Sequence, residues 1–176
     1  GTLFFAIETK HGDGHRFISS LYRRGVRNFV VSSPGAVQEL PNANFVVVEN
    51  SIAALQALAA HHRNAMDIPV VGITGSNGKT VVKEWLYHIV EGNYNVARSP
   101  RSYNSQIGVP LSVWQLRREN NLGIFEAGIS QVGEMESLQR IIRPTIGIMT
   151  NIGDAHQENF ATLEEKCREK MSLFKD

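Results

Sequence analysis

The amino-acid sequence predicts an α/β fold in which helices cover a mainly parallel sheet. Short apolar runs alternate along the chain with helix-like segments, and this alternation is typical of parallel sheets. One of these runs, PVVGIT at 69–74, leads into the small-residue segment GSNGKT at 75–80, and a helical pattern follows directly. The fold therefore includes a glycine-rich turn between a buried strand and a helix.

The strands and helices can be placed in order from the apolar runs and the turn residues between them. Ser51 is the expected N-cap of the second helix, an Ala-rich segment of high helix propensity. The expected strands, each containing Val, Ile, Leu or Phe, are Leu3–Ile7, Asn28–Ser32, Phe45–Glu49, Pro69–Thr74, Tyr94–Ala97, Leu122–Ala127 and Thr145–Thr150. The expected helices are His15–Arg24, Ser51–Met66, Lys79–Val90, Gln106–Arg117, Glu134–Ile141 and Leu163–Phe174.

The segment GSNGKT has the features of a phosphate-binding loop (P-loop). Glycines permit positive φ angles and close backbone approach, so backbone N–H groups and the helix N-terminus can face phosphate oxygens. ATP is the expected ligand, with Lys79 bridging its outer phosphates and the Thr80 hydroxyl binding a Mg²⁺ ion. The strict pattern has glycine six positions before the lysine, where this chain has Ile73, so a simple glycine-rich turn is the alternative. The expected ATP-binding residues of the loop are Gly75, Ser76, Asn77, Gly78, Lys79 and Thr80.

Two domains are expected, with a boundary near Asp67–Pro69, where the Ala-rich helix ends and the next strand begins. Residues 1–67 would form a small N-terminal α/β domain, and residues 68–176 the first part of a P-loop nucleotide-binding domain with a mainly parallel sheet. Both ends of the sequence fall inside element-like patterns, a strand-like TLFFAI and a charged helical EEKCREKMSLFKD. We therefore expect a fragment of a longer protein, with the remaining strands of the second domain beyond Asp176.

The composition is that of an ordinary cytoplasmic protein. Eighteen basic against seventeen acidic residues leave no excess charge to attract nucleic acid or an anionic membrane, so neither partner is expected. Cys167 is the only cysteine, which fits a reducing compartment and excludes a zinc site made of thiolates. No apolar run approaches the roughly 18 residues of a membrane span, and the N-terminal segment lacks the order of a signal peptide.

The form of the loop, GITGSNGKT, resembles the P-loop of the Mur ligases and the related folylpolyglutamate synthases. Further segments appear in the order and approximate spacing of that family's central domain, and LFFAIETKHGDGHRFISSLYRRGVRNFVV resembles the N-terminal domain of one member. Together the similar segments cover nearly the whole chain. Those of the central domain are SPRSYNSQIGVPLS at 99–112, FEAGIS at 125–130, TNIGDAH at 150–156 and EEKCREKMSLF at 164–174.

The resemblance implies an ATP- and Mg²⁺-dependent amide ligase of peptidoglycan precursor synthesis. In the implied reaction, a carboxylate of UDP-N-acetylmuramoyl-tripeptide attacks the γ-phosphate of ATP, and the amine of D-alanyl-D-alanine displaces phosphate from the acyl phosphate. The N-terminal domain is expected at the uridine end of the precursor. Turnover needs the family's C-terminal domain, so residues 1–176 alone are expected to be inactive. A fusion of such a ligase to an alanine racemase is also compatible with this sequence.

Other functions are also compatible with these residues. Within the family, the alternatives are the ligase that adds the third amino acid and a folylpolyglutamate synthase. Outside it, a P-loop kinase acting on a small molecule would use the same loop, but it would have no use for the carbamylated lysine that the resemblance implies at Lys170. A non-catalytic nucleotide-binding module is the third class.

The resemblance also implies site residues outside the loop. Glu126 ends an expected strand, where a carboxylate at the carboxyl edge of a parallel sheet faces the ligand and suits Mg²⁺. His156 is implied as a second metal ligand, and Asn104 is implied near the phosphates. Lys170 is implied to be carbamylated by CO₂ and so to become an anionic metal ligand, with Lys166 as the competing lysine. Lys79, His156 and Lys170 are thus the expected catalytic residues, and Thr80, Glu126, His156 and Lys170 the expected metal ligands.

Each of these residues also has a simpler interpretation. Glu126 would then be a solvated carboxylate at a strand end, and Asn104 a turn residue before the next helix. His156 would be structural or merely exposed, and Lys170 would lie on the surface of a charged helix.

Overall fold

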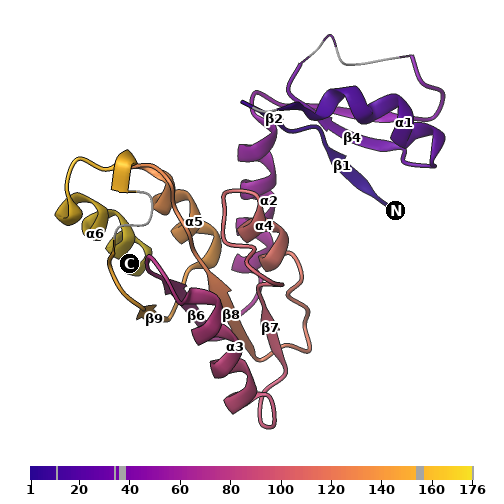
Figure 1. The fold of residues 1–176 in the computed structure, drawn as a ribbon. Coiled ribbons are helices and arrows are strands. Elements are labelled where there is room, and N and C mark those ends of the chain that lie inside the picture. Colours follow the sequence, from indigo (N-terminus) through magenta and orange to yellow (C-terminus); the bar gives the residue numbers. More distant parts are fainter. Residues whose placement is uncertain (11, 34, 36–38, 154–156, 176) are drawn as a thin grey trace. The chain divides into compact units, whose positions relative to one another are not determined.

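The computed structural model describes residues 1–10, 12–33, 35, 39–153 and 157–175, and it confirms an α/β fold with parallel sheets. The described chain divides into two compact units, residues 1–55 and residues 56–176 (Figure 1). None of the helices in these ranges is both long enough and apolar enough to cross a membrane.

The first unit is built on a three-stranded parallel sheet. Its elements are β1 (Leu3–Phe5), β2 (Glu8–Thr9), β3 (Gly12–Asp13), the 3₁₀ turn η1 (Gly14–Phe17), α1 (Ile18–Arg23), β4 (Asn28–Val31) and β5 (Asn44–Val47). The sheet has the order β1-β4-β5, and Phe29 in its central strand stacks on Phe45 with ring centroids 5.3 Å apart. The sequence predicts one helix at His15–Arg24, whereas the structure has η1 followed by α1. The short antiparallel pair of β2 with β3 is not predicted by the sequence.

The helix α2 (Ser51–Asn64) starts one residue after its true cap. The side-chain Oδ1 of Asn50 accepts a hydrogen bond from the Ala53 backbone N–H at 2.9 Å, which is the N-cap interaction. The Ser51 hydroxyl is buried and has no hydrogen-bond partner among the described residues. The prediction of Ser51 as N-cap was therefore wrong by one position, because the preceding asparagine takes that role.

The second unit contains a four-stranded parallel sheet in the order β7-β8-β6-β9 (Figure 1). The strands are β6 (Val70–Thr74), β7 (Val96–Arg98), β8 (Leu122–Glu126) and β9 (Ile146–Met149). The helices are α3 (Lys79–Val90), α4 (Gly108–Val113), α5 (Glu134–Ile142) and α6 (Leu163–Met171), with 3₁₀ turns η3 (Gln157–Asn159) and η4 (Ser172–Phe174). The predicted helices Gln106–Arg117 and Leu163–Phe174 are both shorter than expected. The first is α4 alone, and the second ends as α6 before η4.

Alternating side chains of the buried strands face two different apolar clusters. Val70 and Phe125 belong to a cluster with residues of α4 and α5, whereas Val71 and Ile124 belong to another with residues of α3. This period of two is that of strands covered on both faces. Every residue of β6 and β8 is buried, so these two strands form the centre of the unit.

The division between the two units falls within α2, whereas the sequence predicts a boundary at Asp67–Pro69. The reason is that the second half of α2 packs into the second unit. Ala59 lies in the core there, Gln56 Nε2 donates to the Gln106 side chain at 2.9 Å, and His62 Nε2 lies 2.9 Å from the Leu116 carbonyl oxygen. The roles assigned to the two segments remain predictions.

Arg63, near the end of α2, holds together the C-terminal ends of two helices. Its guanidinium is buried and donates to the carbonyls of Ile142 at 3.0 Å, Met66 at 2.6 Å, Arg143 at 3.2 Å and Ile68 at 3.3 Å. These carbonyls lie at or just beyond the ends of α2 and α5, where helix carbonyls lack internal partners. Burial lowers the pKa of Arg63, and Arg143 lowers it further, although Asp67 opposes the shift.

We expect Arg63→Met to destabilise the protein by about 2 to 4 kcal/mol, because buried carbonyl oxygens lose a charged donor. Urea unfolding monitored by circular dichroism measures the loss. Arg168→Met is the matched control, because Arg168 is exposed and pairs with the exposed Glu164 one turn away on α6, so no measurable change is expected. Equal stability of the two variants would contradict the assignment.

Candidate functional site

The turn between β6 and α3 has the backbone of an anion-binding loop. Gly75 has φ of +139° and Gly78 has φ of +80°, which are angles that residues with a Cβ rarely adopt. Gly78 is the N-cap of α3, and it provides no side chain to cap the first N–H groups of the helix. These groups and the helix dipole are therefore available to an anionic ligand.

The loop that follows β9 fixes the phosphate loop from the side. Ser76 N donates to the Asn151 carbonyl at 2.9 Å, and Asn77 N donates to Asn151 Oδ1 at 3.0 Å. Thr150 Oγ1 donates to the Asn77 carbonyl at 2.6 Å, and Gly153 N donates to Ser76 Oγ at 2.9 Å. Thus the amides of Ser76 and Asn77, which the sequence assigns to phosphate binding, bind Asn151 in this structure.

Two lysine side chains from different helices meet at the start of the loop. Lys79 Nζ, from α3, donates to the Gly75 carbonyl at 2.8 Å, and Lys170 Nζ, from α6, donates to the same carbonyl at 3.3 Å. Burial, together with the nearby ammonium groups of Lys79 and Lys166, lowers the pKa of Lys170 to about 8. Burial also lowers the pKa of Lys79, and Glu126 opposes this effect. The loop therefore lies in a positively charged environment.

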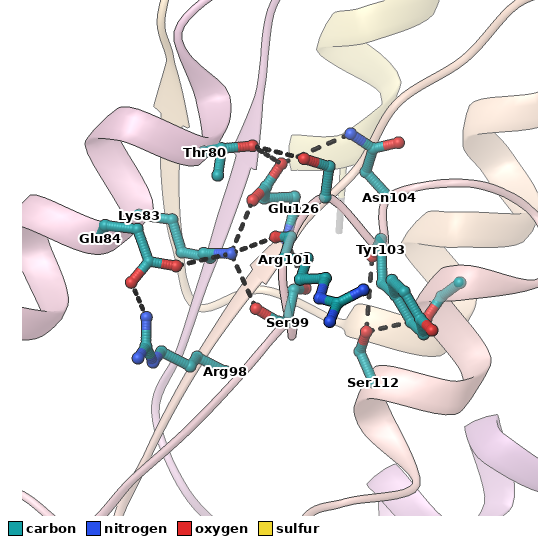
Figure 2. A network of polar contacts seen from close by, with 12 residues as sticks. Thr80, Lys83, Glu84, Arg98, Ser99, Arg101, Tyr103, Asn104, Ser112 and Glu126 are labelled. Atoms are coloured by element: carbon teal, nitrogen blue, oxygen red, sulfur yellow. Dashed lines mark hydrogen bonds and ion pairs between the residues drawn. The ribbon is translucent and has the colours of Figure 1, made fainter.

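The Glu126 carboxylate lies fully buried at the end of β8, and its two oxygens have different partners (Figure 2). Oε2 accepts a hydrogen bond from Thr80 Oγ1 at 3.0 Å and a longer one from Asn104 Nδ2 at 3.4 Å. Oε1 lies 3.0 Å from Lys83 Nζ, in an ion pair without hydrogen-bond directionality. The structure thus brings Thr80, Asn104 and Glu126 together, as the sequence predicts.

Sequence reasoning missed one residue that contacts the candidate site, Lys83. Its side chain is fully buried and contacts Glu84, Glu126 and the loop after β7 (Figure 2). The sequence does indicate that Lys83 is buried. It lies beside Val82 and four residues from Tyr87, and both of these pack on the apolar cluster under α3. A lysine in the apolar stripe of a helix needs a buried partner.

The sequence also names His156 and Lys166 as candidate residues of the site. His156 lies outside the described residues. Lys166 is buried on α6, and its ammonium donates to the Gly153 carbonyl and lies 5.9 Å from the centre of the Phe160 ring. Lys166 therefore contacts the loop after β9, whereas Lys170 contacts the phosphate loop itself.

The described residues fit a Mg²⁺ ion bound together with phosphates. The Thr80 hydroxyl and the Glu126 carboxylate are hard oxygen ligands, and Thr80 Oγ1 lies 3.0 Å from Glu126 Oε2, so the two groups are adjacent beside the loop. Within the described ranges, no three His, Cys, Asp or Glu side chains gather as a metal cluster. Proteins bind Mg²⁺ through one or two carboxylates plus substrate phosphates, and Glu126 offers one such carboxylate.

Known proteins resemble this chain over nearly its whole length. The sequence profile described as "Mur ligase middle domain" matches residues 73–176. A curated UDP-N-acetylmuramoyl-tripeptide--D-alanyl-D-alanine ligase from Borreliella burgdorferi is 35% identical over 98% of this chain and 38% of its own length. A crystal structure of MurF from Acinetobacter baumannii has a TM-score of 0.91 at 28% identity, over 99% of this chain and 38% of its own.

A structure of the MurF ligase from Thermotoga maritima in complex with ADP is also similar. It has a TM-score of 0.86 at 31% identity, over 98% of this chain and 40% of its own. The chain spans about two fifths of the length of these relatives.

We expect Gly75→Ala to disrupt the loop and destabilise the protein by about 1 to 3 kcal/mol. An added Cβ would overlap Thr150 Oγ1 and would lie 3.1 Å from Asn151 N, at a φ that disfavours alanine. Hydrogen exchange at the Ser76 amide should accelerate, because its bond to Asn151 would break. Gly92→Ala is the control, since nothing lies within 4 Å of its added Cβ. Unchanged exchange at Ser76 would contradict this packing.

Proposed function

The chain belongs to the Mur ligase family, and we propose that it carries the nucleotide-binding part of an ATP-dependent ligase of peptidoglycan precursor synthesis. The proposed reaction joins D-alanyl-D-alanine to UDP-N-acetylmuramoyl-tripeptide through an acyl phosphate. The similar UDP-N-acetylmuramoyl-tripeptide--D-alanyl-D-alanine ligase from Borreliella burgdorferi supports this pair of substrates. The observation that carries the proposal is the buried Glu126 carboxylate, which faces the Thr80 hydroxyl beside the phosphate loop.

The reaction needs strong positive charge next to the γ-phosphate of ATP. A carboxylate that attacks the γ-phosphate brings two anions together, so fixed cations and N–H donors must stabilise the transition state. The uncapped N-terminus of α3 and the Lys79 ammonium are in reach of the loop. We expect Lys79 to exchange the Gly75 carbonyl for phosphate oxygens when ATP binds.

Thr80 and Glu126 are the proposed Mg²⁺ ligands from this part of the chain. Bound there, Mg²⁺ would neutralise charge on the phosphates of ATP. The Thr80 hydroxyl and Glu126 Oε2 already lie 3.0 Å apart, so both oxygens face one position next to the loop. Asn104 would hold Glu126 Oε2 in that direction. His156 remains a proposed additional ligand.

Lys170 is the lysine that we propose to be carbamylated. Its neutral amine would add to the carbon of CO₂ with loss of one proton, which gives a carboxylate-like anion. Two ammonium groups, those of Lys79 and Lys170, now share the Gly75 carbonyl and repel each other. Carbamylation of Lys170 would replace this repulsion with attraction, and it would add an oxygen ligand for Mg²⁺.

The remaining parts of the proposal concern location and the first unit. A cytoplasmic location fits the single free cysteine, since disulfides are rare in reducing compartments. No nucleic-acid or membrane partner is proposed. Residues 1–67 are proposed to bind the uridine end of the precursor, and a C-terminal ligase domain is proposed to complete the site for turnover.

A panel of precursors and amines tests the proposed function. The full-length protein should release phosphate from ATP and form an amide product only with UDP-N-acetylmuramoyl-tripeptide plus D-alanyl-D-alanine, as measured by phosphate release and mass spectrometry. Lys79→Ala should lower turnover about 100- to 1,000-fold with the fold intact, because a fixed cation at the phosphates is lost. Lys175→Ala, at an exposed lysine, should turn over normally.

Other results would redirect or reject the proposal. Activity with a folate alone would make the protein a folylpolyglutamate synthase, and activity with a single amino acid would indicate the ligase for the third residue. Phosphorylation of a small molecule without amide formation would indicate a kinase. Near-normal turnover of Lys79→Ala would reject the loop as the site.

We expect a ¹³C-carbamate signal in the NMR spectrum of the full-length protein with ¹³C-bicarbonate, and its loss in Lys170→Gln. The signal should grow as the pH rises through 8, because the neutral amine reacts. At pH 7.5 a pKa of about 8 leaves roughly a quarter of the amine neutral, against roughly one part in a thousand at the ordinary value of 10.5. Lys166→Gln is the control and should keep the signal. The reverse pattern would assign the carbamate to Lys166.

A further inference from the structure

Lys83 is a fully buried cation beside the candidate metal site. Its ammonium lies 3.0 Å from Glu126 Oε1 and 3.0 Å from Glu84 Oε1, and it donates to the Ser99 carbonyl at 2.8 Å and to the Arg101 carbonyl (Figure 2). These partners come from α3, from the end of β8 and from the loop after β7. One side chain thus connects the three segments that surround the metal position.

Charge neutralisation alone does not account for this arrangement. Glu84 is 34% exposed, and it has a second cationic partner in Arg98. Glu126 is fully buried, and Lys83 is the cation that contacts it among the described residues. Lys83 therefore acts mainly on Glu126, and the contact leaves the two carboxylate oxygens in different environments.

The contact with Lys83 fixes which oxygen of Glu126 faces the phosphate loop. Oε1 is held at the Lys83 ammonium, and only Oε2 is directed at the Thr80 hydroxyl. A carboxylate held in this way offers one oxygen to a metal ion. Mg²⁺ demands octahedral geometry with single-oxygen ligation, whereas Ca²⁺ readily accepts both oxygens of a carboxylate.

Lys83 also supports the loop that carries two further polar groups of the site. Arg101 has φ of +50°, a strained angle for a residue other than glycine, and its carbonyl is held by Lys83. The same loop continues to Ser102, whose hydroxyl lies 3.3 Å from Thr80 Oγ1, and to Asn104, which donates to Glu126. Both contacts depend on the path of this loop.

We propose that Lys83 is a positioning residue for the magnesium nucleotide, because it occupies one oxygen of Glu126 and leaves the other as a single ligand. This inference rests on the proposed function, in which Glu126 binds Mg²⁺. Lys83 is then also a determinant of cation preference, because a single oxygen ligand suits Mg²⁺. We therefore expect the wild-type protein to bind nucleotide with Mg²⁺ in preference to Ca²⁺. Without Lys83, Glu126 can use both oxygens, which suits the larger ion.

Calorimetric titration of the full-length protein with ADP, in MgCl₂ or in CaCl₂, tests this role without measuring turnover. In Lys83→Met, the Mg²⁺ concentration for half-maximal ADP binding should rise about 10- to 100-fold, the usual cost of losing an outer-shell partner of a metal ligand. The value for Ca²⁺ should change much less, and ADP binding without metal should be unchanged. Circular dichroism checks the fold.

Two other variants separate the possible causes. Glu84→Gln removes the other carboxylate partner of Lys83 but leaves its contact with Glu126, so it should keep the Mg²⁺ dependence of the wild type. Glu126→Ala tests the underlying metal site: if it leaves the Mg²⁺ dependence unchanged, the proposed function fails. If Glu126→Ala weakens Mg²⁺ binding and Lys83→Met does not, only the role of Lys83 fails.

Three results would overturn the inference directly. The first is an equal rise, in Lys83→Met, of the Mg²⁺ and Ca²⁺ concentrations for half-maximal ADP binding. The second is a rise of the Mg²⁺ concentration in Glu84→Gln that equals the rise in Lys83→Met. The third is a wild-type protein that binds ADP without preference for Mg²⁺. Lys83→Gln is judged by the same criteria if the methionine variant does not fold. The preference of the wild-type protein for Mg²⁺ over Ca²⁺ is measured without any variant, so this result can refute the inference even if neither variant folds.

Discussion

The parallel register of β6 between β8 and β9 is the constraint on which the candidate site depends. Ile73 pairs with Glu126, and Thr74 pairs with Met149, so the three strands end at the same edge of the sheet. The chain that leaves β9 can therefore reach the phosphate loop, and Glu126 can face the start of α3. A register shift of one residue would turn the Glu126 side chain to the other face of the sheet. The chemistry of the site thus follows from backbone pairing in the core.

Buried charge is concentrated at this edge, and most of it is positive. Lys83, Lys166 and Lys170 are at most 3% exposed, and Glu126 is the buried carboxylate among the described residues. Each buried ion costs several kcal/mol unless it is paired and hydrogen-bonded. Backbone carbonyls offset part of that cost for the lysines, but they carry no full negative charge. An anionic ligand such as a triphosphate would offset the rest, so the same buried lysines favour phosphate binding.

The sequence predicts those parts of the site that depend on local pattern. Gly75 and Gly78 were predicted because a strand, a glycine-rich turn and a helix follow one another, and Glu126 because it ends an apolar run. Lys83 was missed, since a lysine on a helix is usually exposed and its burial depends on Glu126, a carboxylate 43 positions further along the chain. The cap of α2 was misplaced because Asn50 and Ser51 are both good N-caps, and local pattern cannot rank such neighbours.

The two buried lysines of α6 illustrate why spacing alone leaves the assignment of a role open. Lys166 and Lys170 are one helical turn apart, so they point to the same side of α6. Their acceptors differ, however, because Lys166 donates to Gly153 in the loop after β9 and Lys170 donates to Gly75 in the turn after β6. Gly153 binds Ser76 in turn, so Lys166 supports the phosphate loop through an intermediate. Only Lys170 shares its acceptor with Lys79, and a change of its charge therefore acts directly on the lysine expected at the phosphates.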